Sequence, residues 1–253
     1  MFAMGPLELL TLFLISSGGA MPDAVSIFPT RDYFKMRGIE TTPAKLIELA
    51  GQDPTTPKAQ IQQLMALRLL AQERKADPAG MEILRAIAAG RKANDKQGFA
   101  QQYAQKALLA MEGKRWMEPE SKEKAAAGIA WFPADAALVG AVDFRLARIP
   151  GVPAAPAEPV LWRFIPEKEK RQILEKVFEV LESTGNVAIY RGAFAMAPGD
   201  KGFDNPRVYT RISGKCNTAW IVDTVKRMTP AAFEEATGPN GEKYHALHIH
   251  GDI

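Results

Sequence analysis

The feature that most constrains this chain is a change in the spacing of its apolar residues near residue 130. Before that point, apolar side chains recur at every third or fourth position, which is the spacing of one helix face. After it, short β-branched stretches alternate with two longer amphipathic segments, a pattern typical of strands and helices packed together. We therefore predict an α+β protein with a helical part over residues 31–127 and a mixed part over residues 128–253.

Four helices are predicted between residues 42 and 113. Thr42, Thr56 and Asp77 each precede a proline, which pairs a capping side chain with a residue suited to the first helical turn. Gly98 opens the fourth segment. The connections are short, and short connections make successive helices antiparallel neighbours. The first part is accordingly predicted to be an antiparallel helical bundle.

Part of this bundle resembles a known repeat. Within residues 56–113, Asp95 and Gly98 are followed by the pairs Tyr103-Ala104 and Ala107-Leu108. This order resembles the second half of a HEAT-type helical repeat. The resemblance covers one to two repeats, whereas stacked repeats need about three units to be stable. It implies HEAT-like helix pairs, with a small bundle docked on the rest of the chain as the simpler form.

The second part is predicted to follow the order strand, helix, strand, strand, helix, strand. These elements are expected at residues 137–146, 167–184, 187–196, 207–213, 218–228 and 243–249. That order is the ferredoxin-like βαββαβ arrangement, in which two helices cover one face of a four-stranded antiparallel sheet. The other face of such a sheet is left for solvent, a partner or another domain.

A second resemblance covers roughly residues 132–228. The segment Phe132-Pro133-Ala134-Asp135-Ala136 is followed by Val142-Asp143-Phe144-Arg145 and later by Gly214-Lys215 ahead of a helix. These motifs resemble those of uncharacterised bacterial envelope proteins that carry a repeated α+β module. No activity is assigned to those families, so the resemblance implies a non-catalytic envelope protein.

Both ends of the chain leave alternatives open. Residues 1–30 lack Lys and Arg and contain an apolar stretch at residues 7–15, followed by small residues up to Ala20. This outline fits a secretory signal cleaved near Ala20, a buried helix or a peripheral membrane anchor, but it is too short to span a bilayer. At the other end, the sequence stops directly after the last predicted strand. This fits either a natural C-terminus or a fragment of a longer protein.

All three histidines lie within residues 245–250. On a strand, side chains alternate between faces, so His248 and His250 share one face and Asp252 follows close by. Two imidazoles and a carboxylate are suitable ligands for a divalent metal. The alternative is that the histidines decorate a sheet edge, since no spacing fixes a third ligand.

Other chemistry is poorly supported by the sequence. The one cysteine, Cys216, excludes an internal disulfide and a thiolate zinc cluster, and it lacks a nearby base. Motifs for a hydrolase elbow, a phosphate loop and a dinucleotide site are missing. We predict no catalytic residue and no cofactor.

The charge balance bears on partners. The chain has 32 basic and 29 acidic residues, a net charge of +3, which is too balanced to indicate a nucleic-acid partner. We expect a non-catalytic interaction or scaffold protein that contacts another protein, or a second copy, through its sheet face or a concave helical surface. The alternative is a metal-binding protein or metal-dependent enzyme centred on His248 and His250.

Overall fold

The structure is a computed structural model of the whole chain. It describes residues 23–73, 76–91, 94–114, 132, 134–143, 166–199, 202–228, 233–237 and 243–247. The first part forms helices α2 (Ala24–Ile27), α3 (Thr30–Met36), α4 (Pro43–Ala50), α5 (Pro57–Glu73), α6 (Pro78–Ala88) and α7 (Phe99–Met111). The second part forms β1 (Leu138–Asp143), α8 (Glu167–Thr184), β2 (Ala188–Gly199), β3 (Gly202–Lys215), α9 (Thr218–Met228), β4 (Phe233–Thr237) and β5 (Lys243–Leu247). The predicted mixture of helices and sheet is confirmed.

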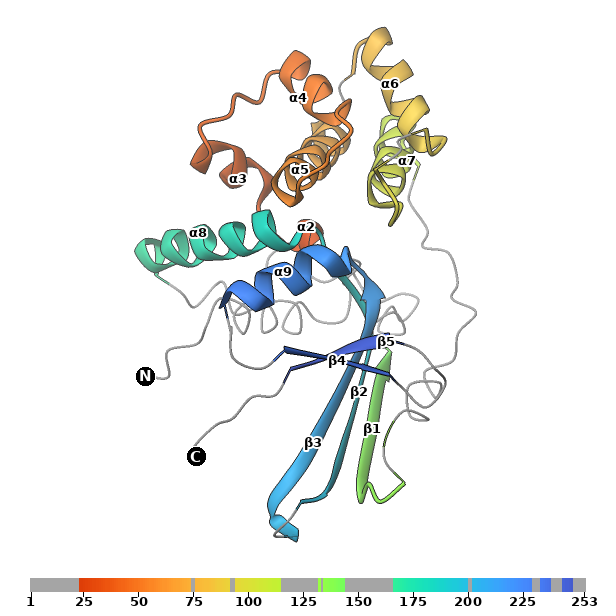
Figure 1. Cartoon of the computed structure of the whole chain (residues 1–253). Helices are drawn as coiled ribbons and strands as arrows, with labels where there is room; N and C mark the ends of the chain where they lie inside the picture. The colour runs from red at the N-terminus through yellow and green to blue at the C-terminus, as the bar shows by residue number, and fades with distance from the viewer. Residues whose placement is uncertain are drawn as a thin grey trace.

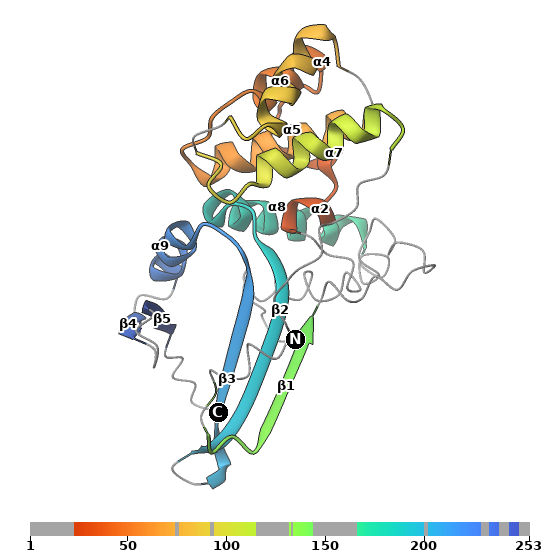
Figure 2. The ribbon, with the colours of Figure 1, turned by 90° about the vertical axis from the view of Figure 1, so that its right-hand side faces the viewer.

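The helices of the first part gather on one side of α8, and the long strands β2 and β3 extend away from them on the other side (Figure 1). The view turned by 90° shows the same two layers, with α8 between the helices and the sheet (Figure 2). One hydrophobic cluster runs from Ala24 in α2 to Ala188 at the start of β2. The core therefore includes residues from both parts of the chain, and the predicted boundary at residues 127 and 128 lies outside the described residues.

Helix α5 occupies the middle of this core. Seven apolar residues of α5 are at most 1% exposed: Ile61, Leu64, Met65, Ala66, Leu67, Leu69 and Leu70. They cover more than one helix face, because α4, α7, α3 and α8 all pack around α5. The polar side chain of Gln63 is buried with them and donates to the carbonyl oxygens of Ala50 and Gln52.

The predicted helix starts are confirmed by their hydrogen bonds. The Thr42 hydroxyl accepts from the Lys45 amide at 3.3 Å, and the Asp77 carboxylate accepts from the Gly80 amide at 2.6 Å. Before α7, the Asp95 carboxylate accepts from the amides of Ala100 and Gln101. These side chains satisfy amides that have no partner inside the helix.

Helix α8 is amphipathic as predicted, and its apolar face packs on the helical part. Leu174, Val177, Phe178, Val180 and Leu181 are all buried. Phe178 packs edge-on against two rings, those of Phe28 and Tyr33, at centroid distances of 6.1 and 5.1 Å. This apolar contact attaches the first part of the chain to the second.

The sheet differs from the ferredoxin-like prediction. The strand order is β1-β2-β3, antiparallel throughout, and β5 pairs with β4 in a separate two-stranded sheet. The described residues thus do not form the single four-stranded sheet that was expected. The reason is β4, a strand that was not predicted. It lies next to β5 in the sequence and pairs with it, so β5 does not join the larger sheet.

Two short helices at the beginning were also missed. Residues 23–30 had been assigned to the apolar N-terminal segment, signal-like or a buried helix, and residues 31–36 to the helical part without a helix of their own. In the structure Ala24, Val25, Phe28, Tyr33 and Phe34 are core residues. The apolar stretch at residues 7–15 and the cleavage point near Ala20 lie outside the described residues.

Candidate functional site

The sheet exposes the large apolar side chains of Leu138 and Phe194 on one face, and Val139, which alternates with Leu138 on β1, is 39% exposed on the other face. In the antiparallel register, Leu138 of β1 lies opposite Met196 of β2, and Gly140 lies opposite Phe194. Residues directly opposite each other, and those two positions further along, share a face. Leu138 is 52% exposed and Phe194 is 43% exposed, while Met196 is partly exposed. We call Leu138, Gly140, Phe194 and Met196 the sheet patch.

Gly140 shapes this patch. A Cβ atom at residue 140 would lie 2.3 Å from Cε1 of Phe194, so the ring lies directly over the glycine. Any larger residue at this position would push the ring aside. The Phe194 ring can lie over β1 because glycine at position 140 leaves that space free.

The opposite face of β2 is buried. Ala193, Ala195 and Ala197 alternate with the patch residues, and Ala195 and Ala197 are completely inaccessible. Strand β2 therefore has a covered face of small residues and an exposed face with large apolar ones. This is the reverse of the usual antiparallel sheet, in which the exposed face is polar.

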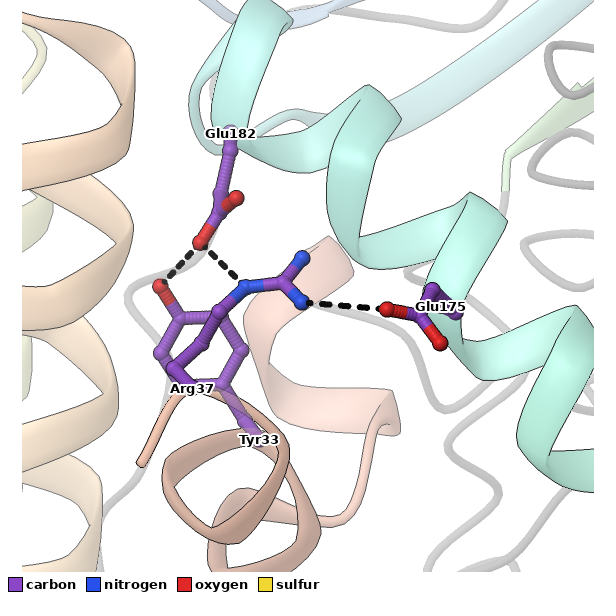
Figure 3. Close-up of polar contacts among 4 residues, drawn as sticks. All are labelled: Tyr33, Arg37, Glu175 and Glu182. Carbon is purple, nitrogen blue, oxygen red and sulfur yellow. Dashed lines mark hydrogen bonds and ion pairs between the residues drawn. The ribbon is translucent and has the colours of Figure 1, made fainter. Parts of the chain in front are cut away.

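A polar cluster lies on the other side of α8, between α8 and α3 (Figure 3). The Glu182 carboxylate accepts from the Tyr33 hydroxyl and from Nε of Arg37, both at 2.8 Å. Oε1 of Glu175, about two helical turns earlier on the same face of α8, lies 3.9 Å from Nη1 of Arg37. The side chains of Arg37 and Glu182 are 13% and 12% exposed, whereas that of Glu175 is 53% exposed.

The polar cluster of Tyr33, Arg37, Glu175 and Glu182 joins two helices, and neither Tyr33 nor Arg37 in it could act as a base. Burial raises the pKa of the Tyr33 hydroxyl, and the negative charge of Glu182 raises it further. Burial lowers the pKa of Arg37, but the hydrogen bond and charge of Glu182 outweigh burial and raise it on balance. Both groups are held in their protonated forms near neutral pH, so neither is suited to act as a base. The cluster fixes α3 against α8.

The predicted metal ligands are not placed by the structure. His248, His250 and Asp252 lie outside the described residues. Within the described part of the chain, no group of three or more His, Cys, Asp and Glu side chains is arranged to hold a metal ion. The metal site stays a prediction.

Cys216 lies between β3 and α9 and is partly buried. Burial raises the pKa of its thiol, and a hydrogen bond with Thr218 offsets this in part. A raised pKa keeps the thiol protonated and unreactive near neutral pH.

Among the helices that the structure describes, none is both long and apolar enough to cross a membrane. Comparison of the chain with protein-family models, with curated proteins and with solved structures finds no match. Both resemblances drawn from sequence motifs therefore stay predictions.

The sheet patch was missed at the sequence level, although a signal for it was present. Residues 207–212 alternate between polar or aromatic side chains and the smaller Val208, Thr210 and Ile212. The register places these three positions opposite Met196, Phe194 and Gly192 of β2. Aligning the alternating residues of this strand with those of the preceding predicted strand would have placed Phe194 and Met196 on the same face as Val208 and Ile212.

Proposed function

We propose that this chain is a non-catalytic protein–protein interaction protein that contacts its partner through the sheet patch. The observation that carries the proposal is that Leu138 and Phe194 share an exposed face while the other face of β2 is buried. The partner is another protein or a second copy of this chain.

Exposed apolar side chains are common when they are scattered, but a contiguous group is typical of a contact surface. Burying apolar area contributes about 25 cal/mol per Å², and one large aromatic side chain often dominates an interface. Phe194 is suited to this role because its ring lies over Gly140 of β1, which has no side chain to displace it. A rigid anchor loses little conformational entropy when it binds.

The helical part serves as a support in this proposal. Its HEAT-like pairs would be α4 with α5 and α6 with α7, which are neighbours in the packing. The pairing of β1, β2 and β3 gives no support to a ferredoxin-like order. The proposed role does not depend on that order, because it needs only the antiparallel pairing of β1 with β2.

Photo-crosslinking from position 194 tests the proposal. The full chain would carry benzoylphenylalanine in place of Phe194, in cells of its own source, and the same group in place of Lys58 as a control. Lys58 is exposed on α5, away from the sheet patch. We expect a discrete protein adduct from position 194 and none of the same mass from position 58.

The mass of the adduct identifies the class of partner. An adduct of twice the chain mass indicates a second copy, and another discrete mass indicates a different protein. Recovery of the uncrosslinked chain alone from position 194 would contradict the proposal.

A further inference from the structure

Strand β1 forms one edge of the three-stranded sheet. In the strand order β1-β2-β3, β1 pairs with β2 on one side, and none of the described strands pairs with its other side. Figure 2 shows β1 at the border of the sheet. In an edge strand, alternate residues point their N–H and C=O groups away from the sheet, so β1 offers a row of backbone donors and acceptors.

The sequence and geometry of β1 leave this edge open to a further strand. All six residues of β1 pair with β2 without a register shift, so the strand is regular. Residues 136–142 contain neither a charged residue nor a proline. Charges, proline and bulges are the features with which proteins usually protect a sheet edge from strand addition.

Strand β3, at the opposite edge of the same sheet, carries this protection. Its sequence contains Pro206 and the charged residues Asp204, Arg207, Arg211 and Lys215. Its pairing with β2 also has two register shifts. The sheet therefore has one protected edge and one unprotected edge, and the unprotected edge borders the sheet patch.

The side chains of β1 indicate which kind of strand fits there. Leu138 is 52% exposed on the face of the sheet patch, and Val139 is 39% exposed on the other face. Ala137 and Ala141 are exposed as well. An added strand alternates its side chains between the two faces as β1 does, so it lies beside apolar residues on both. Uncharged residues over about six positions, the length of β1, suit this edge.

A second copy of β1 fits the edge poorly. In the antiparallel register that sets Leu138 opposite Gly140 of the copy, Asp135 comes opposite Asp143 at each end. Like charges directly opposite each other destabilise a strand pair. The ion pair of Asp135 with Arg207 offsets this only in part, because both side chains are about half exposed.

We propose that the partner contributes an extended, uncharged segment of a different protein, which pairs with the outer edge of β1. Backbone hydrogen bonds give such a contact its affinity, and side chains on alternate positions give it specificity. On one face, the added strand covers Leu138 and the edge of the sheet patch. The inference rests on the proposed function and names the form in which the partner binds.

A charge placed on β1, on the face away from the sheet patch, tests strand pairing. The full chain carries benzoylphenylalanine in place of Phe194, alone or together with Val139→Lys or Phe203→Lys. A strand paired with β1 lies beside residue 139, whereas a partner docked flat on the sheet patch does not. Phe203→Lys is the matched control, because residue 203 is a 57% exposed apolar residue of the protected strand β3.

We expect Val139→Lys to lower the yield of the adduct at least about fivefold and Phe203→Lys to leave it unchanged. The melting temperature of each variant checks its fold, and the exposed Ala141→Lys replaces Val139→Lys if the latter unfolds. An unchanged yield with the added lysine on β1, or an adduct of twice the chain mass, would overturn strand pairing with a different protein while leaving the proposed function intact. Absence of any adduct in the parent contradicts the proposed function itself.

Discussion

Gly185 shows how much a single position matters at the junction between α8 and β2. Its backbone lies at φ 72° and ψ −171°, a conformation that other residues rarely adopt. A Cβ atom there would lie 2.7 Å from Oε1 of Gln60 and 2.7 Å from Cε3 of Trp220. Gln60 accepts from the Asn186 amide at 2.9 Å, so this close approach also orients the start of β2.

We predict that Gly185→Ala lowers the free energy of unfolding by about 3 kcal/mol, because backbone strain and overpacking add. Gly202→Ala is the matched control, since residue 202 also has a positive φ of 67° but no atom within 4 Å of the added Cβ. It is expected to cost about 1 kcal/mol, from strain alone. Urea denaturation of the parent and the two variants measures both changes in the free energy of unfolding. Equal decreases for the two variants would contradict the close packing at Gly185.

Two buried threonines differ in whether their hydroxyl groups are satisfied. Thr30 is 3% exposed and its hydroxyl lacks a partner in the described structure, whereas the Thr184 hydroxyl donates to Val180 and contacts the Gly185 carbonyl oxygen. We predict that Thr30→Val is neutral or stabilising by up to about 1 kcal/mol, and that Thr184→Val destabilises by about 1 kcal/mol. Thermal denaturation gives the sign of each change. A loss for Thr30→Val as large as that for Thr184→Val would show that the Thr30 hydroxyl is bonded.

At the scale of elements, the attachment of α3 to α8 depends on Glu182. Its carboxylate accepts hydrogen bonds from Tyr33 and Arg37, and the Tyr33 ring also packs against Phe178 of the same helix. Because Arg37 is mostly shielded from water, its charge needs a close partner. Glu175 is too exposed and too far away to replace that partner.

We predict that Glu182→Gln lowers the free energy of unfolding by about 2 kcal/mol, the usual range for hydrogen bonds to charged groups. Glu175→Gln, on the same helix and facing the same arginine, is expected to change it by less than about 0.5 kcal/mol. Chemical denaturation at neutral pH compares the two. Similar effects of both variants would mean that the cluster does not hold α3 to α8.

The raised pKa of Tyr33 predicts a loss of stability at alkaline pH. Below its ordinary value of 10.0, the hydroxyl is protonated in both the folded and unfolded chain, so its contribution is complete. Above that value, the unfolded chain releases the proton while the folded chain retains it, and the free energy of unfolding falls as pH rises. We expect the stability of Tyr33→Phe to fall less steeply than that of the parent between about pH 9 and pH 11. Parallel curves for the two proteins, measured by urea denaturation at each pH, would contradict the assignment.

Local signals predicted most of the elements. The capping residues Thr42 and Asp77 act within their own helix, and the apolar face of α8 repeats within one segment, so each is readable without knowing the fold. Helix α2 was missed because its stability comes from Arg68, Tyr103 and Asn186, which are distant in sequence. A four-residue helix has no periodicity of its own to detect.

The sheet topology was harder to predict for the same reason. Alternation identifies a strand, but it does not choose the neighbouring strand, and β4 with β5 formed a sheet of its own. The sheet patch depends on the register of β1 against β2, which places Gly140 under Phe194. Neither residue is distinctive until that register is known.

At the scale of the whole molecule, one core joins both parts of the chain and leaves the sheet to extend from it (Figure 2). Helix α8 contacts the helical part with its apolar face and with Glu182, so the base of the sheet is firmly positioned. The large apolar side chains of the sheet patch stand outside this core. A rigid support with an exposed aromatic anchor is the arrangement expected of an interaction surface.

The most direct test is the affinity of the full chain for the partner captured from position 194. We predict that Phe194→Ser weakens binding at least about tenfold, as loss of a central aromatic anchor does. Gly140→Ala should weaken it too, because the added methyl group displaces the ring without removing it. Lys58→Ser should leave the affinity unchanged. Equal affinities for the parent, Phe194→Ser and Gly140→Ala would contradict a role for the sheet patch in binding.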